Sequence, residues 1–238
     1  PGAEENALHD IDFTAEAGKT TAIIGSTGCG KSTLVSLIPR LFDVSEGSVC
    51  VDGVDIRDMK RKDLRKMIGY VPQKGVLFSG TIASNIRFGK DDATQEEVEK
   101  AAMIAQATEF IEEKEKRYDS EVAQGGNNVS GGQKQRLAIA RAIAKQPKIY
   151  VFDDSFSALD YKTDAALRKA LNSEVADATV IIVAQRISTI MHADQILVLE
   201  DGRIVGRGTH EELLAKNEVY QQIARSQLTQ KDLEGKGC

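Results

Sequence analysis

The residues with the clearest chemistry form a loop near the start of the chain. It runs Gly25-Ser26-Thr27-Gly28-Cys29-Gly30-Lys31-Ser32-Thr33 and fits the phosphate-binding pattern G-x-x-x-x-G-K-[ST]. Its glycines let backbone N–H groups turn inward around phosphate oxygens. In such a loop Lys31 reaches the β- and γ-phosphates, and the Ser32 hydroxyl is a ligand for Mg²⁺. The loop therefore predicts a nucleoside triphosphate site, against the alternative of a glycine turn with a chance lysine.

The segments on either side of this loop give it the context that it needs. Residues 20–24 are apolar and β-branched, which predicts a buried strand. Residues 34–38 predict a helix that ends near Pro39. A strand, a glycine loop and a helix in this order place the positive end of the helix dipole at the phosphates.

We expect a second apolar strand over residues 148–154. It ends in two carboxylates, Asp153 and Asp154. A strand-terminal carboxylate beside a phosphate loop supplies the second protein contact to Mg²⁺. Asp153 is therefore the candidate metal ligand. The alternative is a surface aspartate that only ends a strand.

A third stretch, Val129-Ser130-Gly131-Gly132-Gln133, opens a helix that we expect to run to Ala144. Ser130 can cap this helix, and the two glycines leave its first N–H groups bare, which creates a second anion site. Because the first loop already holds a phosphate, this second site needs another ligand or the nucleotide of another molecule. The alternative is an ordinary glycine-rich helix start.

The remaining pattern predicts an α/β fold. We expect hairpins over residues 46–56 and 195–206, strands over 68–73 and 179–184, and a capped helix from 209. Residues 74–145 indicate a mostly helical insertion, with a capping box at 94–97, an apolar helix face that packs in the core, and a solvated charged run at 109–116.

The predicted organisation is one domain over residues 1–238. Its P-loop core has a mixed sheet and covers about 1–73 and 146–238, with an antiparallel β subdomain and an inserted helical subdomain at about 74–145. The polar tail at 231–238 is expected to be disordered.

Composition excludes some classes of function. The net charge of −5 offers no basic field for nucleic acid. The longest apolar runs, such as residues 180–184, are far too short to span a bilayer. The three cysteines show neither metal-ligand nor disulfide spacing, which favours a reducing, cytosolic setting.

Taken together, these motifs resemble the ATP-binding-cassette (ABC) family over essentially the whole chain. Residues 25–33 resemble its Walker A motif, 149–153 its Walker B motif, and 129–133 its signature sequence, with Val129 where leucine is usual. Gln73 stands at the Q-loop, and residues 157–160, ending in Asp160, stand at the D-loop. Residues 77–86 and 122–126 resemble segments of exporter-type cassettes, although Gln124 replaces the usual acidic residue.

The resemblance implies ATP and Mg²⁺ as cofactors and a head-to-tail dimer with a second nucleotide-binding domain. In that dimer, ATP lies between one chain's Walker A motif and the other chain's signature. The implied metal ligands are Ser32, Gln73 and Asp153, and the implied catalytic residues are Asp154, Gln185 and Gln73. The implied nucleotide-binding residues are Gly25, Ser26, Thr27, Gly28, Cys29, Gly30, Lys31, Ser32, Thr33, Gln73, Ser130, Gly131, Gly132 and Gln133.

The resemblance also implies transmembrane helices as partners and a place at the cytoplasmic face of the cell membrane. In exporters these helices precede the cassette on the same chain, and an aromatic residue that stacks on adenine usually lies just before the segment matching Pro1-Gly2. We therefore expect an excised cassette that lacks the transmembrane domain, this aromatic residue and a first strand.

Two departures from the family pattern bear on catalysis. Asp154 stands where the family usually has the glutamate general base, and Gln185 stands where it has a switch histidine. One lost methylene moves a carboxylate by about 1.5 Å, and glutamine cannot carry a proton or a positive charge. Together the departures resemble the degenerate half of a heterodimeric exporter, whose own site turns over slowly. A homodimeric exporter that tolerates both residues is the alternative.

Two other classes of function stay open on the sequence. One is an ATP-gated dimerisation module without significant hydrolysis at its own site. The other is a soluble ABC ATPase of translation or DNA repair, against which the exporter-like residues 78–86 argue. A nucleotide kinase would share the phosphate loop but gives no reason for residues 130–133.

Overall fold

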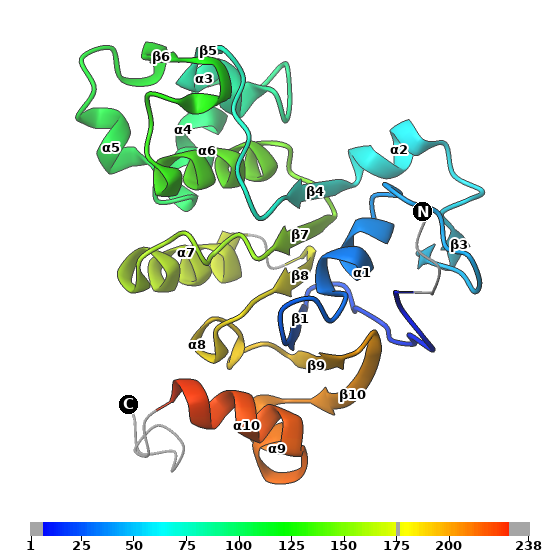
Figure 1. Cartoon of the computed structure of the whole chain (residues 1–238). Helices are drawn as coiled ribbons and strands as arrows, with labels where there is room; N and C mark the ends of the chain where they lie inside the picture. The colour runs from blue at the N-terminus through cyan, green and yellow to red at the C-terminus, as the bar shows by residue number, and fades with distance from the viewer. Residues whose placement is uncertain (1–6, 175–176, 229–238) are drawn as a thin grey trace. The chain divides into compact units, whose positions relative to one another are not determined.

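The computed structural model describes residues 7–174 and 177–228 (Figure 1). The chain divides into two compact units: unit 1 comprises Pro1–Arg65 and Thr179–Cys238, and unit 2 comprises Lys66–Ala178. The Pro1-Gly2 start and the polar tail at 231–238 lie outside the described residues. The subdomain boundaries expected near residues 73 and 146 stay a prediction.

Unit 1 is built on a mixed sheet with the strand order β10-β9-β1-β8. Strand β1 pairs in parallel with β8 and β9, while β10 pairs antiparallel with β9. Residues 21–24 of β1 are buried, as expected for a parallel strand covered on both faces. The strands are β1 Thr20–Gly25, β8 Thr179–Val183, β9 Gln195–Glu200 and β10 Arg203–Gly208.

Among the other described elements of unit 1, the hairpin, the helix after the phosphate loop and the helix from residue 209 were predicted, and three further helices were not. Strands β2 (Cys50–Val51) and β3 (Val54–Asp55) form the expected hairpin. Asp52 and Gly53 turn it with φ angles of 51° and 78°, which suit an Asp-Gly turn. The helices are α1 Lys31–Leu37, α2 Arg61–Lys66 at the unit boundary, α8 Ile187–Ile190, α9 His210–Lys216 and α10 Glu218–Gln227.

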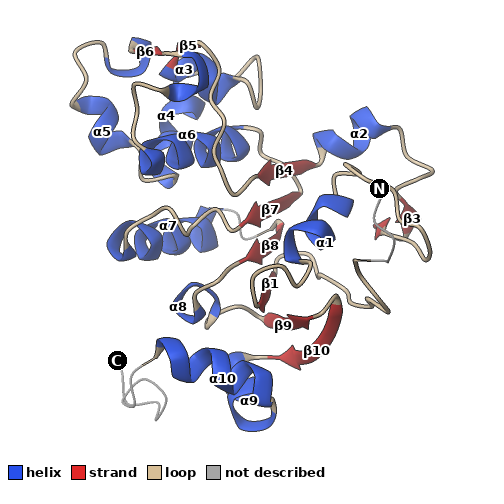
Figure 2. Cartoon of the chain, viewed as in Figure 1, coloured by secondary structure: helices blue, strands red, loops and turns tan. Residues whose placement is uncertain are grey.

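Unit 2 holds a parallel strand pair and most of the helices. Strand β4 (Ile68–Val71) pairs with β7 (Ile149–Asp153), and Pro72 follows the end of β4 as predicted. A short antiparallel pair, β5 (Gly80–Thr81) and β6 (Glu121–Val122), was not predicted. Figure 2 shows these short strands among the helices of the inserted region.

The helices of unit 2 are α3 Ile82–Arg87, α4 Gln95–Ile104, α5 Thr108–Glu112, η1 Arg117–Asp119, η2 Gln124–Gly126, α6 Gly131–Ala144 and α7 Tyr161–Glu174. Among them, α3 and α4 pack against α6. The capping box at 94–97 is confirmed, and the apolar face of α4 is buried as expected. In the charged run at 109–116 the charged side chains face solvent, with Lys114 half-buried, whereas Phe110 and Ile111 pack in the core. The predicted α/β class with a mixed sheet and a helical region is confirmed.

Candidate functional site

The phosphate-binding loop leaves the carboxyl end of β1 and enters α1, as predicted. Gly28 and Gly30 have φ angles of 86° and 102°, a region that favours glycine. Gly25 has a different reason, because a Cβ there would lie 2.0 Å from the carbonyl oxygen of Leu199 on β9. The glycines of this motif are therefore required by backbone geometry and by close strand packing.

Lys31 is folded into the loop that precedes it. Its side chain is buried, and Nζ donates hydrogen bonds to the carbonyl oxygens of Gly25 (2.8 Å) and Ser26 (2.6 Å). The same Nζ lies 3.7 Å from Sγ of Cys29. A buried ammonium at this place is a fixed positive charge that an anion such as phosphate could use.

The loop is braced from the β9–β10 hairpin. The Gly202 N–H, in the turn of that hairpin, donates to the carbonyl oxygen of Cys29 at 3.1 Å, and the His9 N–H donates to the Gly202 carbonyl oxygen at 2.8 Å. In contrast, Ser26, Thr27 and Gly28 face solvent. One side of the loop is thus held by the protein, and the other side is open to a ligand.

Gln185 lies at the same edge of the unit 1 sheet as this loop. Strand β8 runs beside β1, with Ile23 opposite Val183, and the Ala184 N–H donates to the carbonyl oxygen of Ile23 at 3.1 Å. Both strands are parallel, so the loop after β1 and the exposed Gln185 leave the sheet at their carboxyl ends. The structure therefore brings together the two predicted site segments of unit 1.

Asp153 ends β7 in unit 2, Asp154 follows it directly, and both are 5% exposed. The Tyr70 hydroxyl of β4 donates to Oδ2 of Asp153 at 3.0 Å. Burial, and then the nearby Asp153 carboxylate, raise the pKa of Tyr70 well above its usual value. Tyr70 therefore keeps its proton and acts only as a donor to Asp153.

Asp154 is held by the predicted Q-loop residue. Nε2 of Gln73, the exposed residue that follows Pro72, donates to Oδ2 of Asp154 at 2.9 Å. Asp154 has a φ angle of 49°, and aspartate is among the non-glycine residues that adopt this region most readily. Unit 2 thus brings Gln73 and the two carboxylates together at the carboxyl ends of β4 and β7.

Ser130 caps α6 as predicted. Its Oγ accepts from the Gln133 N–H at 3.2 Å, and Oε1 of Gln133 accepts from the Ser130 N–H at 3.0 Å, which completes a capping box. Gly131 is exposed, and among the described residues nothing lies within 4 Å of a Cβ placed on it. The start of this helix is accordingly open to a ligand.

Asp160, at the predicted D-loop, caps α7. Its two carboxylate oxygens accept from the Thr163 N–H at 2.9 Å and the Thr163 hydroxyl at 2.7 Å. These hydrogen bonds lower the pKa of Asp160. A local structural role therefore accounts for this residue within one chain.

The predicted metal ligands suit Mg²⁺ by their chemistry. Ser32, Gln73 and Asp153 offer a hydroxyl, an amide carbonyl and one carboxylate, all hard oxygen donors. Among the described residues, no group of three or more His, Cys, Asp or Glu side chains could hold a metal. Mg²⁺ is commonly bound by one or two carboxylates with nucleotide phosphates and water, so the sparse set fits.

The sequence analysis missed two residues that support the site. Tyr70 binds Asp153 from the neighbouring strand, and Gln227, the last residue of α10, binds the backbone on both sides of Arg186. The strands themselves were predicted, but which strands are neighbours has no local signal.

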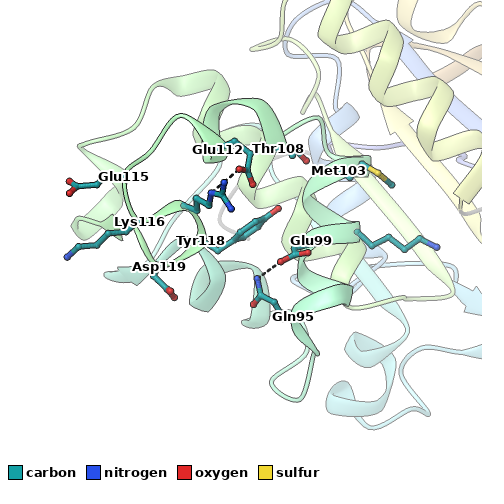
Figure 3. A pocket seen from close by; sticks show the side chains of 11 residues that line it. Gln95, Glu99, Met103, Thr108, Glu112, Glu115, Lys116, Tyr118 and Asp119 are labelled. Atoms are coloured by element: carbon teal, nitrogen blue, oxygen red, sulfur yellow. Dashed lines mark hydrogen bonds and ion pairs between the residues drawn. The ribbon is translucent and has the colours of Figure 1, made fainter.

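Unit 2 also has a surface hollow of about 710 Å³ that contains no predicted site residue. Figure 3 shows Tyr118 in this hollow beside Glu99 and Glu112. Burial, and then these two carboxylates, raise the pKa of Tyr118. The lining residues are Gln95, Glu99, Lys100, Met103, Thr108, Glu112, Glu115, Lys116, Arg117, Tyr118 and Asp119.

The comparisons with known proteins decide the family. The family model described as "ABC transporter" matches residues 8–157 of this chain. The chain belongs to the ABC transporter family. An uncharacterized ABC transporter ATP-binding protein of Mycobacterium tuberculosis is 51% identical over 240 residues, which cover 100% of this chain and 41% of that protein. The chain is therefore an ABC transporter ATP-binding domain, and its P-loop fold is confirmed.

Relatives with more descriptive names are exporters. A β-(1→2)glucan export ATP-binding/permease protein of Rhodopseudomonas palustris is 45% identical over 93% of this chain and 37% of its own length. A putative multidrug export ATP-binding/permease protein of Bacillus subtilis is 45% identical over 92% of this chain and 38% of its own length. This ABC domain is accordingly of the exporter type.

A solved structure supports the same assignment. A bacterial Atm1-family ABC exporter with ATP bound matches with a TM-score of 0.92 and 40% identity, over 95% of this chain and 40% of that one. The ABC domain thus spans about two fifths of the length of the relatives that it matches. Among the described helices, none has the length and apolar character needed to cross a membrane.

Proposed function

We propose that this chain binds and hydrolyses ATP to power an ABC exporter at the cytoplasmic face of a membrane. The observation that carries the proposal is the loop around Lys31, which has a buried ammonium on one side and an exposed opposite side, as phosphate binding would require. The names of the export ATP-binding/permease relatives support the link to transport.

Unit 1 would hold the nucleotide. Lys31 offsets the charge of the β- and γ-phosphates, and the first N–H groups of α1 bind phosphate oxygens. Ser32, Gln73 and Asp153 would hold Mg²⁺, which supplies charge neutralisation at the phosphates when it is bound. Gln185, at the same sheet edge as the loop, donates a hydrogen bond to the γ-phosphate.

The proposed general base is Asp154, assisted by Gln73. A base acts best when it lies about 2.6–3.2 Å from the proton it takes. Because aspartate is one methylene shorter than glutamate, its carboxylate stands about 1.5 Å further back, and such misplacement costs about 10²-fold in rate. The hydrogen bond from Gln73 holds the carboxylate in one position and does not extend its reach.

We further propose that the domain is the degenerate half of a heterodimer. Asp154 and Gln185 weaken its own site, whereas Ser130, Gly131, Gly132 and Gln133 complete the partner's site. The open, capped start of α6 supports this second role, because its free N–H groups can bind the γ-phosphate of the partner's ATP. Transmembrane helices are the other proposed partner.

A second candidate function is ATP-gated dimerisation without turnover at this chain's own site. The same two residues favour it, since neither provides the reach or the charge of the family's usual pair. The soluble ATPase of translation or DNA repair is disfavoured by the exporter relatives.

The test is ATP turnover beside equilibrium binding of a labelled ATP analogue. We expect Mg-ATP binding with little turnover, and with the partner domain present we expect Asp154→Glu with Gln185→His to raise turnover by about 10²-fold. Brisk turnover by the unchanged chain would refute the degenerate site and leave ATP hydrolysis standing. An absence of ATP binding would refute the proposed function itself.

A further inference from the structure

The last residue of α10 holds the loop that carries Gln185. Nε2 of Gln227 donates to the backbone carbonyl oxygen of Gln185 at 2.7 Å, and the Ile187 N–H donates to Oε1 of Gln227 at 2.8 Å. One primary amide thus binds an acceptor and a donor on either side of Arg186. Of the side chains, only asparagine and glutamine offer a donor and an acceptor in this planar arrangement, and asparagine is one methylene shorter.

The other end of α10 is anchored to the rest of unit 1. Asn217 caps the helix by accepting from the Tyr220 N–H at 2.8 Å, and its Nδ2 donates to the carbonyl oxygen of Val205 on β10 at 2.9 Å. Tyr220 is fully buried, and its hydroxyl lies 2.7 Å from Nδ1 of His210 on α9. The helix is therefore fixed at its start.

Helix α10 therefore connects strand β10 to the loop that carries Gln185, with side-chain hydrogen bonds to the backbone at both of its ends. Ten helical residues span about 15 Å, from the anchored Asn217 to the terminal Gln227. In Figure 1, α10 runs from the β10 side of unit 1 towards α8, the helix that follows the loop. The direction of the exposed Gln185 side chain depends on the backbone that carries it, and Gln227 binds that backbone on both sides of Arg186.

We propose that Gln227 is a positioning residue for Gln185. It fixes the peptide on each side of Arg186, so that the Gln185 side chain points to the γ-phosphate of bound ATP. This inference rests on the proposed function, since it acts through the proposed contact of Gln185. It predicts that discrimination between ATP and ADP depends on the end of a helix that need not touch the nucleotide.

The test measures Mg-ATP and Mg-ADP dissociation constants for the whole chain and its variants. Gln185→Ala should reduce the preference for ATP over ADP by about tenfold, as for one lost hydrogen bond to a charged group. Gln227→Leu, similar in size, should reduce it to the same level without changing ADP affinity. In the Gln185→Ala background, Gln227→Leu should have no further effect, because the two residues act in series.

A second readout follows the loop directly. In Gln227→Leu the Ile187 amide loses its acceptor, so its hydrogen exchange should accelerate while the melting temperature stays that of the unchanged chain. Gln222→Ala, at an exposed glutamine of the same helix, is the matched control and should change neither readout.

The outcomes separate this inference from the proposed function. If Gln185→Ala leaves the ATP preference unchanged, the proposed role of Gln185 is wrong and the positioning role falls with it. If Gln185→Ala lowers the preference and Gln227→Leu does not, only the positioning role is wrong. If Gln227→Leu lowers the preference for ATP equally in the Gln185→Ala background, Gln227 acts independently of the Gln185 side chain, and the positioning role is also wrong.

Discussion

Replacing Gly25 by alanine tests whether the tight contact at the base of the phosphate loop is real. The new Cβ would lie 2.0 Å from the Leu199 carbonyl oxygen and 2.8 Å from Sγ of Cys29. Since Gly25 and Leu199 are opposite each other on β1 and β9, the backbones must separate by more than about 1 Å to reach ordinary contact. Overpacking of this kind costs about 1–3 kcal/mol.

That cost has two measurable consequences. For a chain of this size, 1 kcal/mol changes the melting temperature by about 2–4 °C, so Gly25→Ala should lower it by about 2–12 °C. The displaced loop also moves the carbonyls that hold Lys31. We therefore expect affinity for a labelled ATP analogue to fall by at least about tenfold, because the Lys31 ammonium is displaced from its place beside the proposed phosphate positions. Thermal unfolding and equilibrium titration measure the two effects.

The same substitution at Gly131 is the control. This glycine starts α6, and within the described residues a Cβ there meets nothing within 4 Å. Alanine in a helix is favoured over glycine by up to about 1 kcal/mol, so Gly131→Ala should keep or slightly raise the melting temperature and leave this chain's own ATP affinity unchanged. A wild-type melting temperature for Gly25→Ala would refute the close β1–β9 contact at the loop.

Three further predictions concern single side chains. Lys31→Ala should weaken Mg-ATP binding by about 10³-fold in a titration, since a charge pair at 4 Å is worth about 4 kcal/mol at an effective dielectric constant of 20; unchanged affinity would exclude the phosphate contact. Tyr70→Phe removes the donor to buried Asp153 and should destabilise the chain by about 1.5–3 kcal/mol in urea unfolding, and a loss below about 0.5 kcal/mol would contradict that contact. Burial holds the pKa of His210 below its ordinary value of 6.5, so the folded chain binds fewer protons than the unfolded chain. The contribution of His210 to stability is therefore present above pH 6.5 and lost as the pH falls below it. His210→Gln keeps a polar partner for Tyr220 and should reduce the fall in the free energy of unfolding between pH 7.5 and about 5, measured by urea unfolding. An equal fall in both proteins would contradict this prediction.

Local sequence signals predicted the individual elements well. The sequence predicted the strand, glycine loop and helix at residues 20–37, the hairpin over residues 46–56, the capping box at 94–97 and the helix cap at Ser130. Each depends on interactions within four residues, such as a side-chain oxygen that accepts from the N–H three positions on. Because these interactions are local, the types and spacing of neighbouring residues were sufficient to predict them.

The contacts between distant segments could not be predicted in this way. The sequence identified Lys31, Asp153 and Asp154 but not the groups that hold them, because Gln73 and Asp154 are 81 positions apart and meet only where β4 and β7 lie side by side. The short β5–β6 pair was missed for the same reason, since two residues carry almost no strand pattern. Gln227 has no local signal that would predict its contacts, because its two backbone partners are 40 and 42 positions away.

The sequence by itself therefore determined the chemistry of the chain: a phosphate loop, two strand-terminal carboxylates and a capped glycine helix start of the exporter-type ABC domain. Only the tertiary structure decided how each group is supported, with the Lys31 ammonium on two loop carbonyls, Asp153 on Tyr70, and the Gln185 loop on the end of α10. The physical reason is the distance along the chain over which each kind of interaction acts. Backbone propensity and capping act over one turn of chain, whereas strand neighbours and helix packing are fixed by burial of the whole core.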